Sequence, residues 1–139
     1  MADAVLVVTT GLTLITTALV NLGEDSPKFV QWGVGDTAPT TTDVDLELKT
    51  GCNEARVNTD AVVATATVDG LTDDTFRVTA LITKAGAIAA ITEVATFDSI
   101  GAGTPPDGDV MFLRATFDAI NLVIGNSIDF TIDTQFVPV

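Results

Sequence analysis

Two acidic loops contain the residues whose types and spacing come closest to a binding site. One loop reads DGLTDD and the other reads PPDGD. Each places several carboxylates close together, and calcium prefers such oxygen ligands. Neither loop has the spacing of an EF-hand, and Asp and Gly are also the ordinary residues of turns. We therefore predict no metal site, and the calcium candidates that the sequence offers are Asp69, Asp73, Asp74, Asp107 and Asp109.

Catalytic arrangements are disfavoured by the residues that the chain lacks. It contains no His, which excludes a His-dependent catalytic triad and the usual zinc sites. Paired carboxylates could act as acid and base on a sugar, but fifteen Asp and four Glu form such pairs by chance, and there is no Tyr and one Trp to stack a sugar ring. Cys52 has no His to activate it and is expected to be a small buried thiol. The sequence thus predicts a protein that is not an enzyme and needs no cofactor.

The charge of the chain argues against nucleic acid as a partner. Nineteen acidic residues outnumber six basic ones, and the formal net charge is -13. Such a charge repels nucleic acid and anionic lipid. Three arginines are expected inside strands, where the excess of acids predicts that each pairs with a carboxylate. These are Arg56, Arg77 and Arg114.

The elements that must position these residues are predicted to be strands. Residues 127–136 alternate apolar and polar side chains, with Ser127, Asp129, Thr131, Asp133 and Gln135 in the polar register, which is expected to face solvent or a neighbouring subunit. Residues 110–117 also alternate, and the intervening Gly125-Asn126 pair predicts an antiparallel hairpin. Residues 75–83, 88–97 and several shorter segments read as further strands. The pattern predicts an all-β protein, an antiparallel β-sandwich of about eight or nine strands that includes jelly-roll variants, with no helix longer than two turns.

The first 22 residues form an apolar run. No cation precedes Lys28, unlike in a secretory signal, and five Thr and Gly11 interrupt the run, unlike in a membrane helix. We expect no membrane association and interpret residues 1–23 as an apolar arm or strands, followed by a β-sandwich domain at residues 24–139. An apolar arm needs a cover, so the chain is expected to be a homo-oligomer. The interface candidates are Val5, Leu6, Val7, Leu12, Leu14, Ile15, Leu19 and Val20, together with Trp32, which is expected in a core or an interface.

Four segments occur together in a recognisable order: KFVQWGVGDTAPTTTDVDLELKT, ITEVATFD, VMFLRATFDAI and GNSIDFTID. This combination resembles small virion structural proteins of tailed bacteriophages, in which a W-G-x-G-x-T-A-P segment precedes a variable middle and a closing pair of strands. The likeness covers residues 28–136 and leaves the apolar arm outside it.

The resemblance implies a part of a virion, and among such parts we expect a capsid decoration (cement) protein. Its partners would be the major capsid protein and further copies of itself, with a trimer favoured, and its location would be the outer capsid surface. A head or tail fibre adaptor domain is the alternative within the same resemblance. A carbohydrate-binding module for host recognition is an alternative of a different class, because β-sandwiches often carry such sites.

Overall fold

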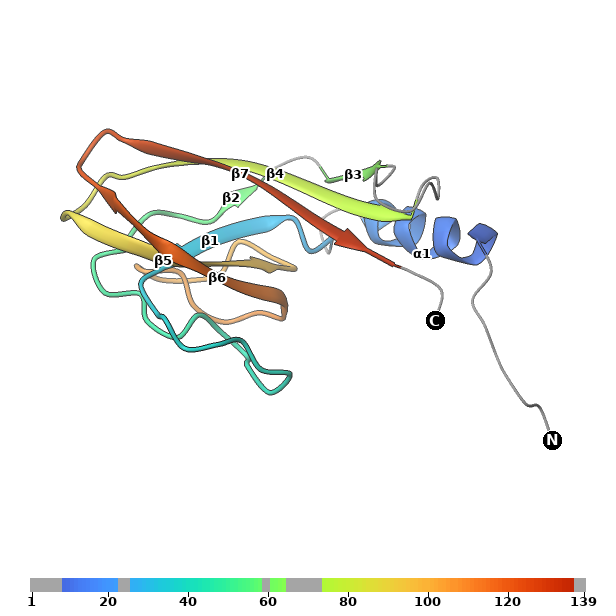
Figure 1. The fold of residues 1–139 in the computed structure, drawn as a ribbon, viewed down its shortest axis with the longest axis horizontal. Helices are drawn as coiled ribbons and strands as arrows, with labels where there is room; N and C mark the ends of the chain where they lie inside the picture. Colours follow the sequence, from blue (N-terminus) through green and yellow to red (C-terminus); the bar gives the residue numbers. More distant parts are fainter. Residues whose placement is uncertain (1–8, 23–25, 59–60, 65–73, 137–139) are drawn as a thin grey trace.

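The computed structural model of this chain describes residues 9–22, 26–58, 61–64 and 74–136, and Figure 1 shows their arrangement. One helix, α1 (Thr9–Asn21), precedes seven strands. The strands are β1 (Phe29–Gly33), β2 (Val57–Asn58), β3 (Ala61–Ala64), β4 (Thr75–Thr83), β5 (Ala89–Phe97), β6 (Met111–Leu122) and β7 (Ser127–Gln135). Within these residues, no helix combines the length and the apolar character needed to cross a bilayer.

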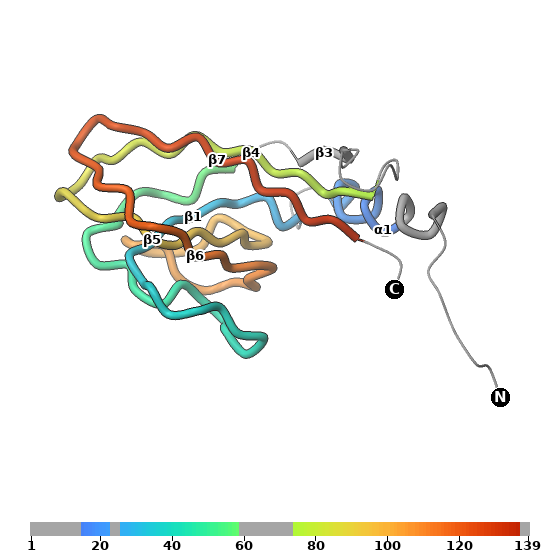
Figure 2. The backbone as a smooth tube through the Cα atoms, viewed as in Figure 1, coloured from blue at the N-terminus to red at the C-terminus, as the bar shows by residue number. Residues whose placement is uncertain are grey.

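The strands form two antiparallel sheets, which confirms the predicted all-β, sandwich-like fold. The four-stranded sheet has the order β2-β1-β5-β6, and the three-stranded sheet has the order β3-β4-β7. Figure 2 follows the chain as it crosses between the two layers. The described strands number seven, fewer than the eight or nine expected, because residues 34–56 run mainly as loops and the N-terminal run contains a helix.

The prediction that β6 and β7 form a hairpin is wrong. β6 pairs with β5, whereas β7 pairs with β4 along its whole length, from Ser127 opposite Thr83 to Gln135 opposite Thr75. The turn at Gly125 and Asn126 therefore carries the chain from one sheet to the other. Both of these turn residues make backbone hydrogen bonds of 2.8 Å to Lys84, which fixes the corner. Alternation identified the strands correctly but carries no information about which strand pairs with which.

The prediction that no helix exceeds two turns is also wrong, as is the prediction of strands in this part of the apolar run. α1 is 13 residues long and lies against β3 and β4 at one end of the sandwich. Thr16 is buried on the helix, and Leu19 and Val20 pack against the core one turn later. These buried residues are three and four positions apart, which is the spacing of residues on one face of a helix. The packing of this face against the core outweighs the preference of Thr for strands.

Hydrophobic residues fill two clusters, one on each face of the four-stranded sheet. The larger cluster lies between the sheets and includes Trp32, Phe76, Ile91 and Phe130. The smaller cluster lies on the outer face of the four-stranded sheet, and its members are Phe29, Leu46, Ala95 and Phe97. Residues 34–56 and 98–110, which we call the loop layer, cover that outer face. β1 is consequently buried at all five positions and does not alternate.

Candidate functional site

The three calcium candidates that the structure describes do not converge on one point. Asp69 and Asp73 lie outside the described residues. Asp74 is buried at the start of β4, where it accepts hydrogen bonds from Thr75 Oγ1 and from the side-chain amide of Gln135. Asp107 pairs with Lys49, and Asp109 pairs with Arg56 at 3.1 Å; these two aspartates thus hold different cations. In the part of the chain that the structure describes, no three His, Cys, Asp or Glu side chains are grouped to hold a metal ion.

The predicted interface residues have different surroundings. Val5, Leu6 and Val7 lie outside the described residues, as do the side chains of Leu12 and Leu14 in α1. Ile15 is exposed, whereas Leu19 and Val20 pack against the core. Trp32 is 1% exposed and meets Phe130 edge to face with ring centroids 6.4 Å apart, so it belongs to the core of the chain and not to an exposed interface.

Cys52 is a buried thiol, as predicted, and burial raises its pKa to about 11. The predicted pairing of the arginines with carboxylates is also confirmed, but Arg56 lies in the loop just before β2 and not inside a strand as expected. Arg56, Arg77 and Arg114 each bind at least one carboxylate, and all of these partners belong to the same chain.

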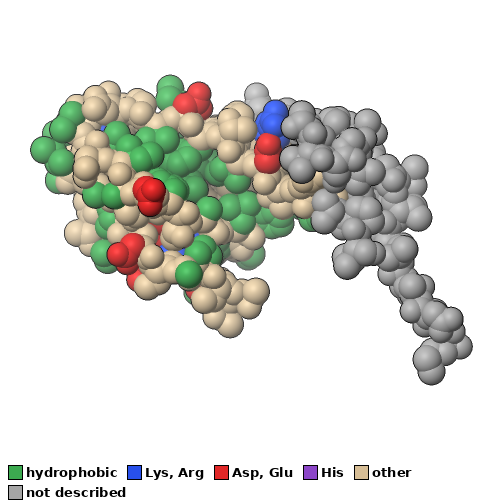
Figure 3. Space-filling model, in the orientation of Figure 1, with side chains coloured by type: hydrophobic (Ala, Val, Ile, Leu, Met, Phe, Trp, Pro, Cys, Tyr) green, Lys and Arg blue, Asp and Glu red, His purple; other side chains and the backbone are tan. Residues whose placement is uncertain are grey.

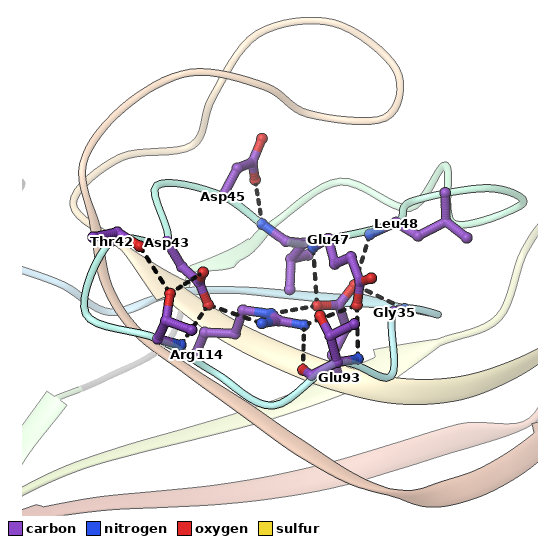
Figure 4. Close-up of polar contacts among 11 residues, drawn as sticks. Gly35, Thr42, Asp43, Asp45, Glu47, Leu48, Glu93 and Arg114 are labelled. Atoms are coloured by element: carbon purple, nitrogen blue, oxygen red, sulfur yellow. Dashed lines mark hydrogen bonds and ion pairs between the residues drawn. The ribbon is translucent and has the colours of Figure 1, made fainter.

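A buried carboxylate, Glu93 of β5, is the centre of the most connected polar cluster. Its side chain is fully buried and accepts four hydrogen bonds, shown in Figure 4. Three of these come from backbone amides of the loop layer, namely those of Gly35 (2.9 Å), Glu47 (3.1 Å) and Leu48 (3.0 Å). The fourth comes from Nε of Arg114 on the neighbouring strand β6, at 2.7 Å. Glu93 therefore holds both ends of a loop against the sheet.

Arg114 extends the same cluster outward. Its side chain is 3% exposed and also donates to Asp43 at 2.8 Å, to Glu47 at 3.3 Å and to the carbonyl oxygen of Thr37 at 3.1 Å. The hydrogen bonds of the Thr40 amide and hydroxyl, followed by that of Arg114, lower the pKa of Asp43 to about 2. The guanidinium thus lies among three carboxylates, and we call Glu93, Arg114, Asp43 and Glu47 the Glu93 cluster.

Two glycines of the W-G-x-G segment make room for this cluster. A Cβ atom on Gly33 would lie 2.7 Å from the carbonyl oxygen of Leu48. A Cβ atom on Gly35 would lie 2.7 Å from Oε1 of Glu93 and 2.5 Å from Cβ of Glu47. All three distances are well inside van der Waals contact, so only glycine allows the loop to approach the carboxylate this closely.

A second buried cation, Arg56, fastens the other half of the loop layer. Its guanidinium lies 3.6 Å over the ring of Phe97 and donates to Gln31 at 2.8 Å and to Asp109 at 3.1 Å. It also donates to the carbonyl oxygens of Ser99 and Gly108. The cation replaces its hydration with ring and oxygen contacts, so a full positive charge can lie beneath the loops.

A third pair links the loop layer to the inner core. Lys84 donates to Glu54 at 2.6 Å, and Glu54 also accepts from Nε1 of Trp32 at 3.0 Å. Burial favours a higher pKa for the Glu54 carboxyl, but the hydrogen bonds from Lys84 and Trp32 outweigh it and lower the pKa to about 2. The carboxylate is therefore held in its charged form.

One open depression of about 490 Å³ lies beside the Glu93 cluster, on β5 and β6. It presents two carboxylates, two hydroxyls and one aromatic ring. Its lining residues are Asp36, Thr92, Thr116, Phe117, Asp118 and Ala119. Thr92 already donates to the carbonyl oxygen of Gly35, at 2.8 Å, so one hydroxyl is used to hold the loop layer.

The buried cations Arg56, Lys84 and Arg114 therefore hold loops in place. Sequence reasoning anticipated that Arg114 would find a carboxylate but missed Glu93, because an acid at the centre of a strand reads as a solvent-facing residue. The available signal was the run ITEVATF, in which Glu93 is the only charged residue of a strand that is otherwise uncharged. Comparisons of the chain with protein-family models, with curated proteins and with solved structures gave no match.

Proposed function

We propose that this protein is a non-enzymatic structural component of a bacteriophage virion, a decoration protein that binds the outer surface of the head and stabilises it. One observation carries the proposal. Three of the four segments that resemble phage virion proteins meet at the Glu93 cluster, where Gly35, Glu93 and Arg114 hold the loop layer on the sheet. These segments thus fasten the loop layer to the sheet, which suits a protein with a mechanical role.

The distribution of charge supports an outer position. Five of the six basic residues form ion pairs within the chain, and the side chains of Arg56, Lys84 and Arg114 are almost fully buried. Because these three cations are buried, acidic side chains account for most of the charge at the surface of a chain whose net charge is -13. An acidic surface is repelled by packaged nucleic acid and fits the outer face of a shell.

The copy number per particle tests this proposal. We expect virions of the phage that encodes the chain to contain many copies, as measured by quantitative mass spectrometry against the major capsid protein, its proposed partner. Purified protein should also bind capsids that lack it and raise their melting temperature. A few copies per virion would favour the fibre adaptor, and absence from virions would overturn both assignments.

A specific observation also keeps a carbohydrate-binding function as a second candidate. The depression on β5 and β6 combines hydroxyls and carboxylates with the half-buried ring of Phe117, and these are groups that bind sugars. A glycan array should then give binding that Asp118→Ala removes while Asp129→Ala, on the exposed register of β7, leaves it unchanged. An array without any bound glycan would exclude this candidate.

A further inference from the structure

The side of the sandwich formed by β6 and β7 is open. β6 is the last strand of the four-stranded sheet and β7 the last strand of the other, so none of the described strands pairs with the outer edge of either. β6 is also the longest strand, with 12 residues, which corresponds to about 40 Å of unpaired backbone at ~3.3 Å per residue. An exposed edge of this length readily accepts another strand.

Apolar side chains accompany this free edge. Phe112 is 38% exposed and Ile120 is 41% exposed, although Phe112 contacts the core residue Phe76 and Ile120 lies opposite the buried Ile91. Figure 3 shows hydrophobic side chains gathered on this face, over the region where β6 and β7 diverge. In a chain of charge -13, the stretch from Ala115 to Leu122 carries one charged residue, Asp118. A second copy could approach here with little repulsion.

The sequence also contains a segment suited to such an edge. Residues 4–8 read AVLVV, an uncharged and mostly β-branched sequence of the kind that favours strands. This segment immediately precedes α1. It and the stretch of β6 from Ala115 to Leu122 are alike in being apolar and nearly free of charge.

Geometry prevents a copy from covering its own β6 in this way. The last turn of α1 lies beside the start of β6, since Leu19 and Leu22 share a groove with Val110 and Phe112. From this contact, the helix extends back toward its N-terminus and away from the sandwich, whereas β6 extends to the other side, across the sandwich (Figure 1). The 13-residue helix is about 20 Å long at ~1.5 Å per residue, whereas five extended residues span about 17 Å. Residues 4–8 therefore cannot run beside residues 115–121 of the same chain.

We propose that residues 4–8 of one copy add a strand to the free edge of β6 in a second copy. The contact is heterologous, with a donor surface and a different acceptor surface, so repeated use gives a ring where the rotation between copies closes, and a trimer is one such ring. This inference deepens the self-association that belongs to the proposed function. Purified protein tests it without capsids, so its failure would leave capsid binding to be judged by its own experiment.

Crosslinking between two variants tests the contact directly. Leu6→Cys protein is mixed with tagged Ala119→Cys protein, and a short bifunctional maleimide is added. Cys52 stays silent because it is buried. We expect a covalent product that contains one tagged and one untagged chain. Leu81→Cys, at a 60% exposed site on the other sheet, is the matched acceptor control and should give none. Equal yields from both acceptors, or a product of two Ala119→Cys chains alone, would overturn the proposal.

Complementation provides a second test. Val7→Asp damages the donor and Ile120→Lys damages the acceptor, and each should raise the dissociation constant about tenfold or more, since burial of one Val side chain alone is worth that factor. Leu81→Lys is the control and should not change the oligomer. A mixture of the two damaged variants should form a dimer through its one intact contact, measured by native mass spectrometry. A mixture that stays monomeric, or a wild-type protein that is monomeric at micromolar concentration, would refute the inference.

Discussion

Replacing Glu93 by Gln should destabilise the fold by about 3–5 kcal/mol, because it removes the charge of a fully buried ion pair. The geometry gives the same size by a second route. Each carboxylate oxygen accepts two of the four hydrogen bonds. In either orientation, the Gln amide group would face two donors, and two hydrogen bonds to a charged group are worth about 3–6 kcal/mol.

Such a loss would be a large part of the ~5–15 kcal/mol that stabilises a typical domain. For a chain of this length it corresponds to a fall in melting temperature of roughly 10–20 °C. Urea unfolding followed by the fluorescence of Trp32, a buried residue and the only Trp, measures the change.

The matched control is Asp133→Asn, which breaks a pair of the same kind at the surface. Asp133 binds Arg77 through two hydrogen bonds of 2.7 Å, but both side chains are about 40% exposed. Solvent screens this pair, so its loss should cost about 0–1 kcal/mol. If Glu93→Gln proved no more destabilising than Asp133→Asn, the view that the Glu93 cluster holds the loop layer would be wrong.

Three further results are expected. Gly35→Ala should lower the free energy of unfolding by about 1–3 kcal/mol, because the added Cβ would clash with Glu47. Gly86→Ala should lower it far less, because no neighbouring atom lies closer than 3.5 Å to the added Cβ. Equal losses in the two variants would contradict the close approach of the loop at Gly35. Because the folded-state pKa of Glu54 is lowered to about 2, ionised Glu54 contributes its full stabilisation above its unfolded pKa, near 4.5, and this stabilisation is lost as the pH falls toward 2. Chemical unfolding at several pH values should therefore show that the free energy of unfolding falls less steeply with acid in Glu54→Gln than in the wild type. Cys52 should react with a disulfide reagent at pH 8 only after urea unfolds the chain, and rapid labelling of the native protein would show that the thiol is accessible.

The sequence predicts the strands that are buried on one face. In β4, Phe76, Val78, Ala80 and Ile82 alternate with more exposed neighbours, and the structure places all four in the core. The polar register of β7 is likewise exposed from Ser127 to Asp133. Apolar and polar residues alternate with a period of two when one face of a strand is exposed to water, as in β4 and β7.

The remaining features depend on contacts between distant segments. β1 and residues 93–97 of β5 are buried between the loop layer on one face and the other sheet on the opposite face, so alternation is absent there. Glu93 is the only charged residue of its run, but its partners have no local signature, because its donors lie 21 to 58 residues away. The pairing of β6 with β5, and the helical course of Thr16 and its neighbours, are decided by packing that local propensity does not encode.

Burial of the Glu93 carboxylate also determines how the loop layer can move. If only one end of the loop between Gly35 and Leu48 lifted, the Glu93 carboxylate would stay buried but would lose part of its hydrogen bonds, at a cost of several kcal/mol. Partly lifted positions are therefore rare, and the loop is either docked or released as a whole. The amide hydrogens of Gly35, Glu47 and Leu48 should accordingly exchange with solvent in a single concerted opening, although up to 13 residues separate them along the chain.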